Sequence, residues 1–196
     1  KKINFQGKKV FSDSKLRNII RSEEGRFWKF ITSNKYLDEL KIKQDEKRLK
    51  QYYQRKGYYN VNVKSSYAKN INNKFFELNF NIDSGEKFFF NDISIEINDD
   101  FNKENFVKIN NDIKKLKGKK YSSKIVNKTL DEIDQILLSR EFLFLNTKYD
   151  LSIVDKNKIN LKFKFEDLEK FYVERINIFG NFITEEKVIR NALIVD

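Results

Sequence analysis

The chain has 196 residues, enough for one large or two small domains with a hydrophobic core. It contains neither His nor Cys, which excludes histidine general-base catalysis, a cysteine nucleophile, disulfides and thiolate metal sites. The net charge of +11 lies mainly in residues 1–86, with 20 Lys and Arg against 10 Asp and Glu, so attraction to an anionic partner belongs to that part.

The first part of the chain predicts the element order β-α-α-β-β. A strand-like stretch at 3–7 precedes a short helix, for which Ser12 is a good N-cap residue. A longer helix is predicted from Leu37 to Lys56, because apolar residues recur there at helical spacing, and Gly57 suits its C-terminal end. Alternating apolar residues then predict a strand over Tyr58–Ser66 and another over 76–82.

The second part repeats this order. It predicts a strand at 93–97, helices near 103–116 and 122–140, and strands at 143–153 and 158–165. A third copy begins with a strand-like stretch at 176–180 and a helix whose N-cap candidate is Thr184.

The repeat is visible in the letters of the sequence. The stretch EKFFFNDISI begins at Glu86 and its near copy EKFYVERINI begins at Glu169, 83 positions later. Each copy marks the seam between two units. The units are predicted at 1–86, 87–168 and 169–196, the last one truncated. Because the chain contains no Met, we expect it to be a segment of a longer protein.

The order and spacing of these motifs resemble POTRA (polypeptide-transport-associated) domains. The resemblance rests on Ile-Asn-Phe-x-Gly at 3–7, Tyr-Tyr-x3-Gly-Tyr at 52–58 and Ile-Asp-Ser-Gly-Glu-x-Phe at 82–88. Phe-Trp-Lys-Phe at 27–30 with Asn-Lys-Tyr at 34–36 is similar to an inter-helix loop of a third POTRA domain in outer-membrane barrel assembly factors. Residues 87–168 then correspond to a fourth domain and 169–196 to the start of a fifth.

The resemblance implies an α+β fold of tandem β-α-α-β-β units, each a three-stranded mixed sheet with two helices on one face. It also implies a periplasmic arm of an outer-membrane protein whose C-terminal barrel this chain does not contain. Such an arm binds unfolded outer-membrane proteins and accessory lipoproteins of the assembly complex. It needs no catalytic residue, metal or cofactor.

In this family, clients are thought to bind by strand addition to an exposed sheet edge, a mode that reads backbone and not sequence. The corresponding edge would be 143–153 in the second unit. In the first unit it would be formed by Tyr58, Tyr59, Asn60, Val61, Asn62, Val63, Lys64 and Ser65. Phe27 and Trp28 are more simply explained as core residues, and if exposed they would anchor a lipoprotein partner.

The alternative function is binding of nucleic acid, in the manner of tandem RNA-recognition modules. Lys56–Val61 partly matches their signature, and the basic first unit adds attraction to phosphate. However, the second stacking position is Asn60, which has no aromatic ring, and the order of the elements differs. We therefore expect no nucleic-acid partner.

Overall fold

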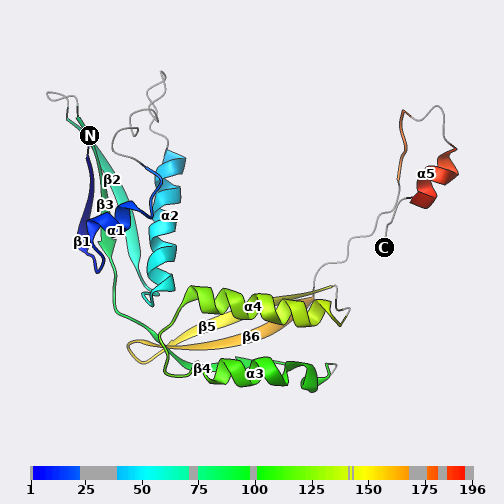
Figure 1. The fold of residues 1–196 in the computed structure, drawn as a ribbon. Coiled ribbons are helices and arrows are strands. Elements are labelled where there is room, and N and C mark those ends of the chain that lie inside the picture. The colour runs from blue at the N-terminus through cyan, green and yellow to red at the C-terminus, as the bar shows by residue number, and fades with distance from the viewer. Residues whose placement is uncertain are drawn as a thin grey trace.

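A computed structural model describes residues 2–22, 39–70, 75–97, 101–140, 142, 144–167, 176–180 and 185–192. The elements form two similar α+β units joined by a short connection (Figure 1). Within these described ranges, no helix has the length and apolar character needed to cross a bilayer.

The first unit contains one three-stranded mixed sheet and two helices. Its elements are β1 (Lys2–Lys8), α1 (Asp13–Arg17), α2 (Glu39–Arg55), β2 (Asn62–Asn70) and β3 (Phe75–Asp83). The strand order is β1-β3-β2: β3 pairs parallel with β1, with Phe5 opposite Phe80, and antiparallel with β2, with Ser65 opposite Phe80.

The second unit repeats this topology. Its elements are β4 (Phe89–Ile95), the 3-10 helix η2 (Lys103–Phe106), α3 (Val107–Lys114), α4 (Ser123–Leu138), β5 (Leu145–Val154) and β6 (Lys158–Asp167). The strand order is β4-β6-β5, again with the last strand in the centre. The predicted fold class is confirmed.

Each unit has its own hydrophobic core between the sheet and the helices. In the first unit the alternating residues Leu78, Phe80 and Ile82 of β3 are fully buried, and Leu49 and Tyr53 of α2 pack against the same cluster. In the second unit Leu161 and Phe163 of β6 and Ile133 of α4 hold the equivalent places. Alternation in a strand and a helical stripe facing each other explain this two-layer packing.

Several predicted boundaries are confirmed, including Ser12 as the N-cap of α1, whose hydroxyl accepts the amide of Lys15. The prediction for the start of β2 is wrong, because the strand begins at Asn62 and not at Tyr58. Residues 58–61 form a turn instead, in which Tyr58 and Val61 are buried. β4 begins four residues before the predicted Ile93, because Phe89 and Phe90 pair with β6.

The two units meet in a joint formed by the end of α2, the turn that follows it and residues 87–88 and 118–122. Gly57 has φ +103°, and its carbonyl accepts the amide of Phe88 at 2.9 Å. The ring of Tyr59 lies edge-on to both Phe88 and Tyr121 of the second unit. The two units are therefore joined by packed contacts as well as by the chain itself.

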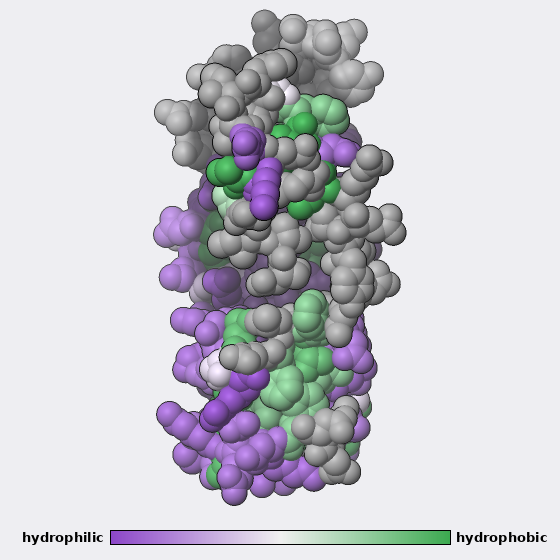
Figure 2. Space-filling view, turned by 90° about the vertical axis from the view of Figure 1, so that its right-hand side faces the viewer, coloured by the Kyte–Doolittle hydropathy of each residue, from purple (hydrophilic) through white to green (hydrophobic). Residues whose placement is uncertain are grey.

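Figure 2 views the molecule from the right-hand side of Figure 1 and shows hydrophobic surface on the end of the second unit that faces the viewer. The exposed apolar side chains at element ends there are Val107, Leu138 and Phe144. They begin α3, end α4 and precede β5, so they lie at the end of the unit opposite the joint (Figure 1).

The third copy of the repeat differs from its prediction. Residues 176–180 form no strand, although their pattern alternates, and they belong to neither of the two described sheets. The expected helix is present as α5 (Glu186–Ala192), whereas Thr184, its predicted N-cap, lies outside the described residues.

The packing of Gly7 in β1 generates a stability prediction. Gly7 has φ +88°, and an added Cβ would lie 2.5 Å from the carbonyl oxygen of Ile82, which is backbone and cannot rotate away. We expect Gly7→Ala to lower the free energy of unfolding by more than about 2 kcal/mol, measured by urea denaturation.

Gly118→Ala is the matched control. Gly118 also has a positive φ, +77°, but an added Cβ meets no atom within 4 Å. Only the backbone cost of roughly 1–2 kcal/mol is expected there. Equal losses in the two variants would contradict the packing argument.

Candidate functional site

The candidate site for strand addition is a sheet edge, and the two sheets have four edges: β1 and β2 in the first unit, β4 and β5 in the second. An edge strand offers unpaired amides and carbonyls to another chain unless other groups occupy them. The four edges differ in how far this has happened.

The β1 edge is occupied by basic side chains. The guanidinium of Arg17 donates to the carbonyl of Ile3 at 2.7 Å, and the ammonium of Lys9 donates to the carbonyl of Phe5 at 2.9 Å. Residues two apart on a strand face the same side, so these are successive outward acceptors. An incoming strand would have to displace two cations.

The β4 edge is occupied by main chain. Phe90 donates its amide to Lys119 and accepts the amide of Gly118 at 2.7 Å, while Phe88 accepts the amide of Tyr121. An isolated antiparallel bridge also joins Phe89 and Lys120. The connection between α3 and α4 therefore fills the start of this edge, at residues 88–90, where a client strand would begin to pair.

The β2 edge is much more open. The amide of Ser65 donates to a carboxylate oxygen of Glu46 on α2 at 2.5 Å, so this amide points away from β3. By the alternation of an antiparallel strand, the amides of Val63 and Tyr67 point to the same open side. Among the described residues, Glu46 is the only side chain that bonds to the backbone of β2.

A groove of about 290 Å³ runs between α2 and this edge. Glu39, Ile42, Lys43 and Glu46 line it on the helix side, and Ser65, Ser66 and Tyr67 line it on the strand side. Tyr67 is 53% exposed, so the groove offers an aromatic ring as well as free backbone.

At the β5 edge of the second unit, no described carboxylate holds an outward amide as Glu46 does at β2. In the described part of the chain, no side chain bonds to the backbone of β5. Instead, cross-strand ion pairs join Lys148 to Glu166 and Asp150 to Lys164, the latter at 3.2 Å. These contacts lower the pKa of Glu166, through Lys148, and raise that of Lys164, through Asp150.

The structure divides the predicted site residues of the first unit. Asn62, Val63, Lys64 and Ser65 lie on the edge strand β2. Tyr58, Tyr59, Asn60 and Val61 lie before it, in the turn at the joint. They cannot pair with a client strand as part of that edge.

Phe27 and Trp28 lie outside the described residues. The segment that leads toward them is fixed at its start by Asp45 of α2, which is 1% exposed. Its carboxylate accepts the amides of Arg21 and Ser22 at 2.8 and 3.0 Å and pairs with Arg48.

Sequence reasoning did not find Glu46, because an acidic residue on the polar side of a helix is usually just solvated. Its role depends on the distance from α2 to β2, which only the packed structure supplies. The turn conformation of Lys56–Val61 also removes the RNA-recognition interpretation of that stretch, since it forms no strand on which bases could stack.

The contact between Glu46 and the amide of Ser65 can be tested directly. We expect Glu46→Ala to accelerate hydrogen exchange of the Ser65 amide by roughly tenfold, since a charge-assisted hydrogen bond is lost. Two-dimensional NMR of the labelled chain measures this rate. Glu39→Ala, on the same helix and in the same groove, should leave it unchanged. Equal exchange in Glu46→Ala and the unaltered chain would contradict the contact.

Comparison with known proteins identifies the fold that carries these edges. Residues 1–85 match the family model POTRA, described as "Surface antigen variable number repeat". The chain is 25% identical to the outer membrane protein assembly factor BamA of Neisseria meningitidis, over 97% of this chain and 24% of that protein. It is 23% identical to BamA of Neorickettsia risticii, over 98% of this chain and 26% of that protein.

The chain thus spans about a quarter of the length of these curated relatives. Among solved structures, it is similar to POTRA domains 3–5 of Haemophilus influenzae BamA with a TM-score of 0.65. That match has 12% identity and covers 100% of this chain and 76% of the other. The fold of this chain therefore agrees with that of the Haemophilus influenzae POTRA domains. Residues 1–85 thus match the POTRA family, and the chain is similar over nearly its whole length to BamA proteins.

Proposed function

We propose that the chain is part of the periplasmic polypeptide-binding arm of an outer-membrane protein assembly factor, and that it binds unfolded β-barrel clients by strand addition to β2. The similarity to proteins named outer membrane protein assembly factor supports the general role. The open β2 edge supports the mode of binding, and it is the observation on which the proposal rests.

Strand addition suits such a role because backbone hydrogen bonds do not depend on the sequence of the client. At β2 a client strand would bond to the outward amides of Val63, Ser65 and Tyr67. The Glu46 carboxylate would leave Ser65 as the client enters. Replacing one hydrogen bond by another makes this exchange nearly neutral in energy, and the groove along α2 accommodates alternate client side chains.

The same carboxylate explains how an open edge avoids uncontrolled pairing. Glu46 of α2 and Lys64 of β2 place charged groups along the edge, and the cost of removing these groups from water opposes association of two copies of the chain. A client supplies enough contacts along the strand to displace one side chain, whereas a chance encounter with a short segment does not.

The other parts of the proposal concern the units. We propose that the first two units span 1–86 and 87–168 and that 169–196 begins a further one, since β4 pairs only within the second sheet. Docking of accessory lipoproteins near Phe27 and Trp28, and attachment to the outer membrane through a barrel, belong to the same proposal.

A pair of substitutions at Tyr67 tests strand addition. Tyr67→Pro removes the outward amide, whereas Tyr67→Ala removes the exposed ring and keeps the amide. We expect Tyr67→Pro to reduce photo-crosslinking of an unfolded barrel-strand peptide to β2 by at least about fivefold, and Tyr67→Ala to reduce it much less, because the backbone supplies the binding. Mass spectrometry of the crosslinked peptides measures both.

Val63→Pro removes a second outward amide and should act like Tyr67→Pro. Val61→Pro is not a suitable variant, because Val61 is buried outside the strand. Its replacement would disturb the packing of the unit and not the edge. Crosslinking that survives both Tyr67→Pro and Val63→Pro, or that is lost equally in Tyr67→Ala, would count against strand addition at this edge.

A further inference from the structure

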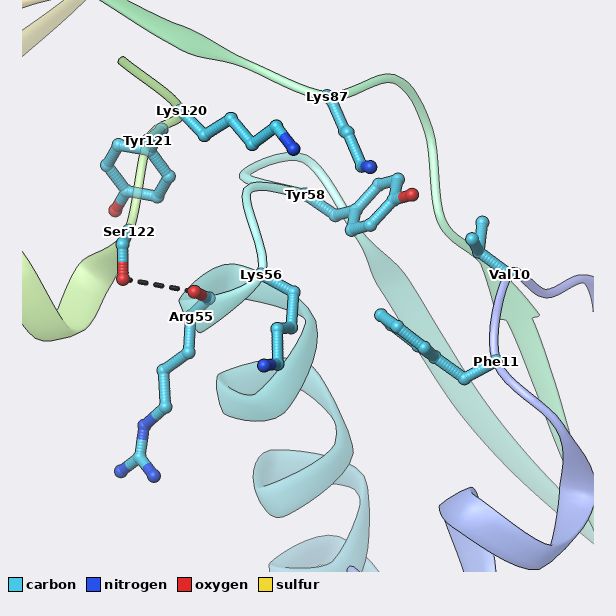
Figure 3. A pocket seen from close by; sticks show the side chains of 9 residues that line it. All are labelled: Val10, Phe11, Arg55, Lys56, Tyr58, Lys87, Lys120, Tyr121 and Ser122. Atoms are coloured by element: carbon cyan, nitrogen blue, oxygen red, sulfur yellow. Dashed lines mark hydrogen bonds between the residues drawn. The ribbon is translucent and has the colours of Figure 1, made fainter.

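The joint between the two units encloses a pocket of about 310 Å³ (Figure 3). It shares no residue with β2 or β5. Its lining comes from the segment before α1, from the end of α2 and from the second unit, namely Val10, Phe11, Arg55, Lys56, Tyr58, Lys87, Lys120, Tyr121 and Ser122.

Four of these nine residues are cations and none is acidic. Lys87 and Lys120 reach toward the space beside Tyr58, whereas the side chains of Arg55 and Lys56 point away from these two ammonium groups (Figure 3). The ammonium of Lys56 lies 5.9 Å from the centre of the Tyr52 ring. In the described part of the chain, none of the four forms an ion pair with a carboxylate. Neighbouring basic side chains without acidic partners favour binding of an anionic ligand.

The rest of the pocket is apolar and aromatic. Tyr58 and Tyr121 are 5% and 3% exposed, so they form firm walls, and Val10 and Phe11 complete them. The ammonium of Lys87 lies 5.5 Å from the centre of the Tyr58 ring, a cation–π contact that leaves its charge available. Burial raises the pKa of the Tyr121 hydroxyl, which is therefore neutral and does not offset the cations.

We propose that this joint pocket binds an acidic peptide segment of a partner protein, with a carboxylate between Lys87 and Lys120 and an adjacent apolar side chain against Phe11 and Val10. The combination of charge and apolar wall favours a peptide over a lipid. A lipid headgroup would satisfy the cations but offers no apolar group to the wall, because its acyl chains stay in the bilayer.

Binding at this place would also couple the two units. Two hydrogen bonds hold the joint. The amide of Phe88 donates to the carbonyl of Gly57, and the hydroxyl of Ser122 donates to the carbonyl of Arg55 at 3.0 Å. A ligand whose carboxylate binds Lys87 and Lys120 while its apolar side chain packs on Phe11 would tie the second unit to the first and restrict their relative movement. The inference does not depend on strand addition at β2.

The test uses a capped, fluorescent five-residue peptide of alternating glutamate and phenylalanine, titrated into the full chain and followed by anisotropy. We expect saturable binding that weakens as salt is raised from about 0.01 to about 1 M, which shortens the Debye length from about 30 to about 3 Å. The double variant Lys87→Glu/Lys120→Glu should weaken binding by about tenfold or more, since attraction becomes repulsion.

Lys47→Glu/Lys108→Glu is the matched control, with the same change in net charge, one site in each unit and both exposed outside the pocket. It should leave the affinity within about twofold. Lys87→Gln/Lys120→Gln removes the two charges without adding an acidic group, and it should weaken binding several-fold. It replaces the Glu variant in the test if the Glu variant misfolds. Urea denaturation checks the fold of each variant.

Three results would overturn the proposal: no saturable binding, equal weakening by the pocket and control variants, or no dependence on salt. A fourth concerns the lipid alternative. If vesicles of equal parts phosphatidylglycerol and phosphatidylcholine bind through Lys87 and Lys120 while the peptide does not, the pocket recognises headgroups and not peptides.

Discussion

The last strand of each unit lies in the centre of its sheet, and the rest of the structure depends on this placement. Because β3 pairs with β1 on one side and with β2 on the other, the hairpin strand β2 is forced to the edge. In the second unit, β6 likewise pairs with β4 on one side and with β5 on the other, so β5 lies at the edge. A meander order would instead have hidden the middle strand and left the last one outside. The central strand also anchors the core, since Leu78, Phe80 and Ile82 are fully buried. Stability and an exposed edge therefore come from one topological choice.

The two units are alike at the edge of the first strand of each sheet and differ at the edge of the hairpin strand. In both, the edge of the first strand is filled, by Arg17 and Lys9 at β1 and by residues 118–121 at β4. The hairpin edges remain available, but only β2 is held by a carboxylate, that of Glu46. Residues 118–121 also form one wall of the joint, because Lys120 and Tyr121 line its pocket. Closure of the β4 edge and assembly of the joint thus use the same segment.

Much of this fold could be predicted from sequence, since β3, β6 and the long helices carry periodic patterns that their packing preserves. The errors occur where tertiary contacts decide. Tyr59, Val61 and Val63 alternate like a strand, yet the joint buries Tyr58 and Val61 in a turn after Gly57. Residues 176–180 alternate too, but a strand forms only within a sheet, and these residues lie outside both sheets of the described part of the chain. The roles of Glu46 and of the basic joint pocket depend on distances between elements, which no local pattern encodes.

The central claim is that backbone groups on the open side of β2 receive client strands. Amide hydrogen exchange of the labelled chain, measured with and without an unfolded barrel-strand peptide, tests it most directly. Strand addition predicts new protection at the outward amides of Val63 and Tyr67, while Ser65, which already donates to Glu46, stays protected. Protection of β1 and β4 should be unchanged because other groups bond to their edges. Protection at β1 or β4, or protection of β2 without alternation, would contradict it.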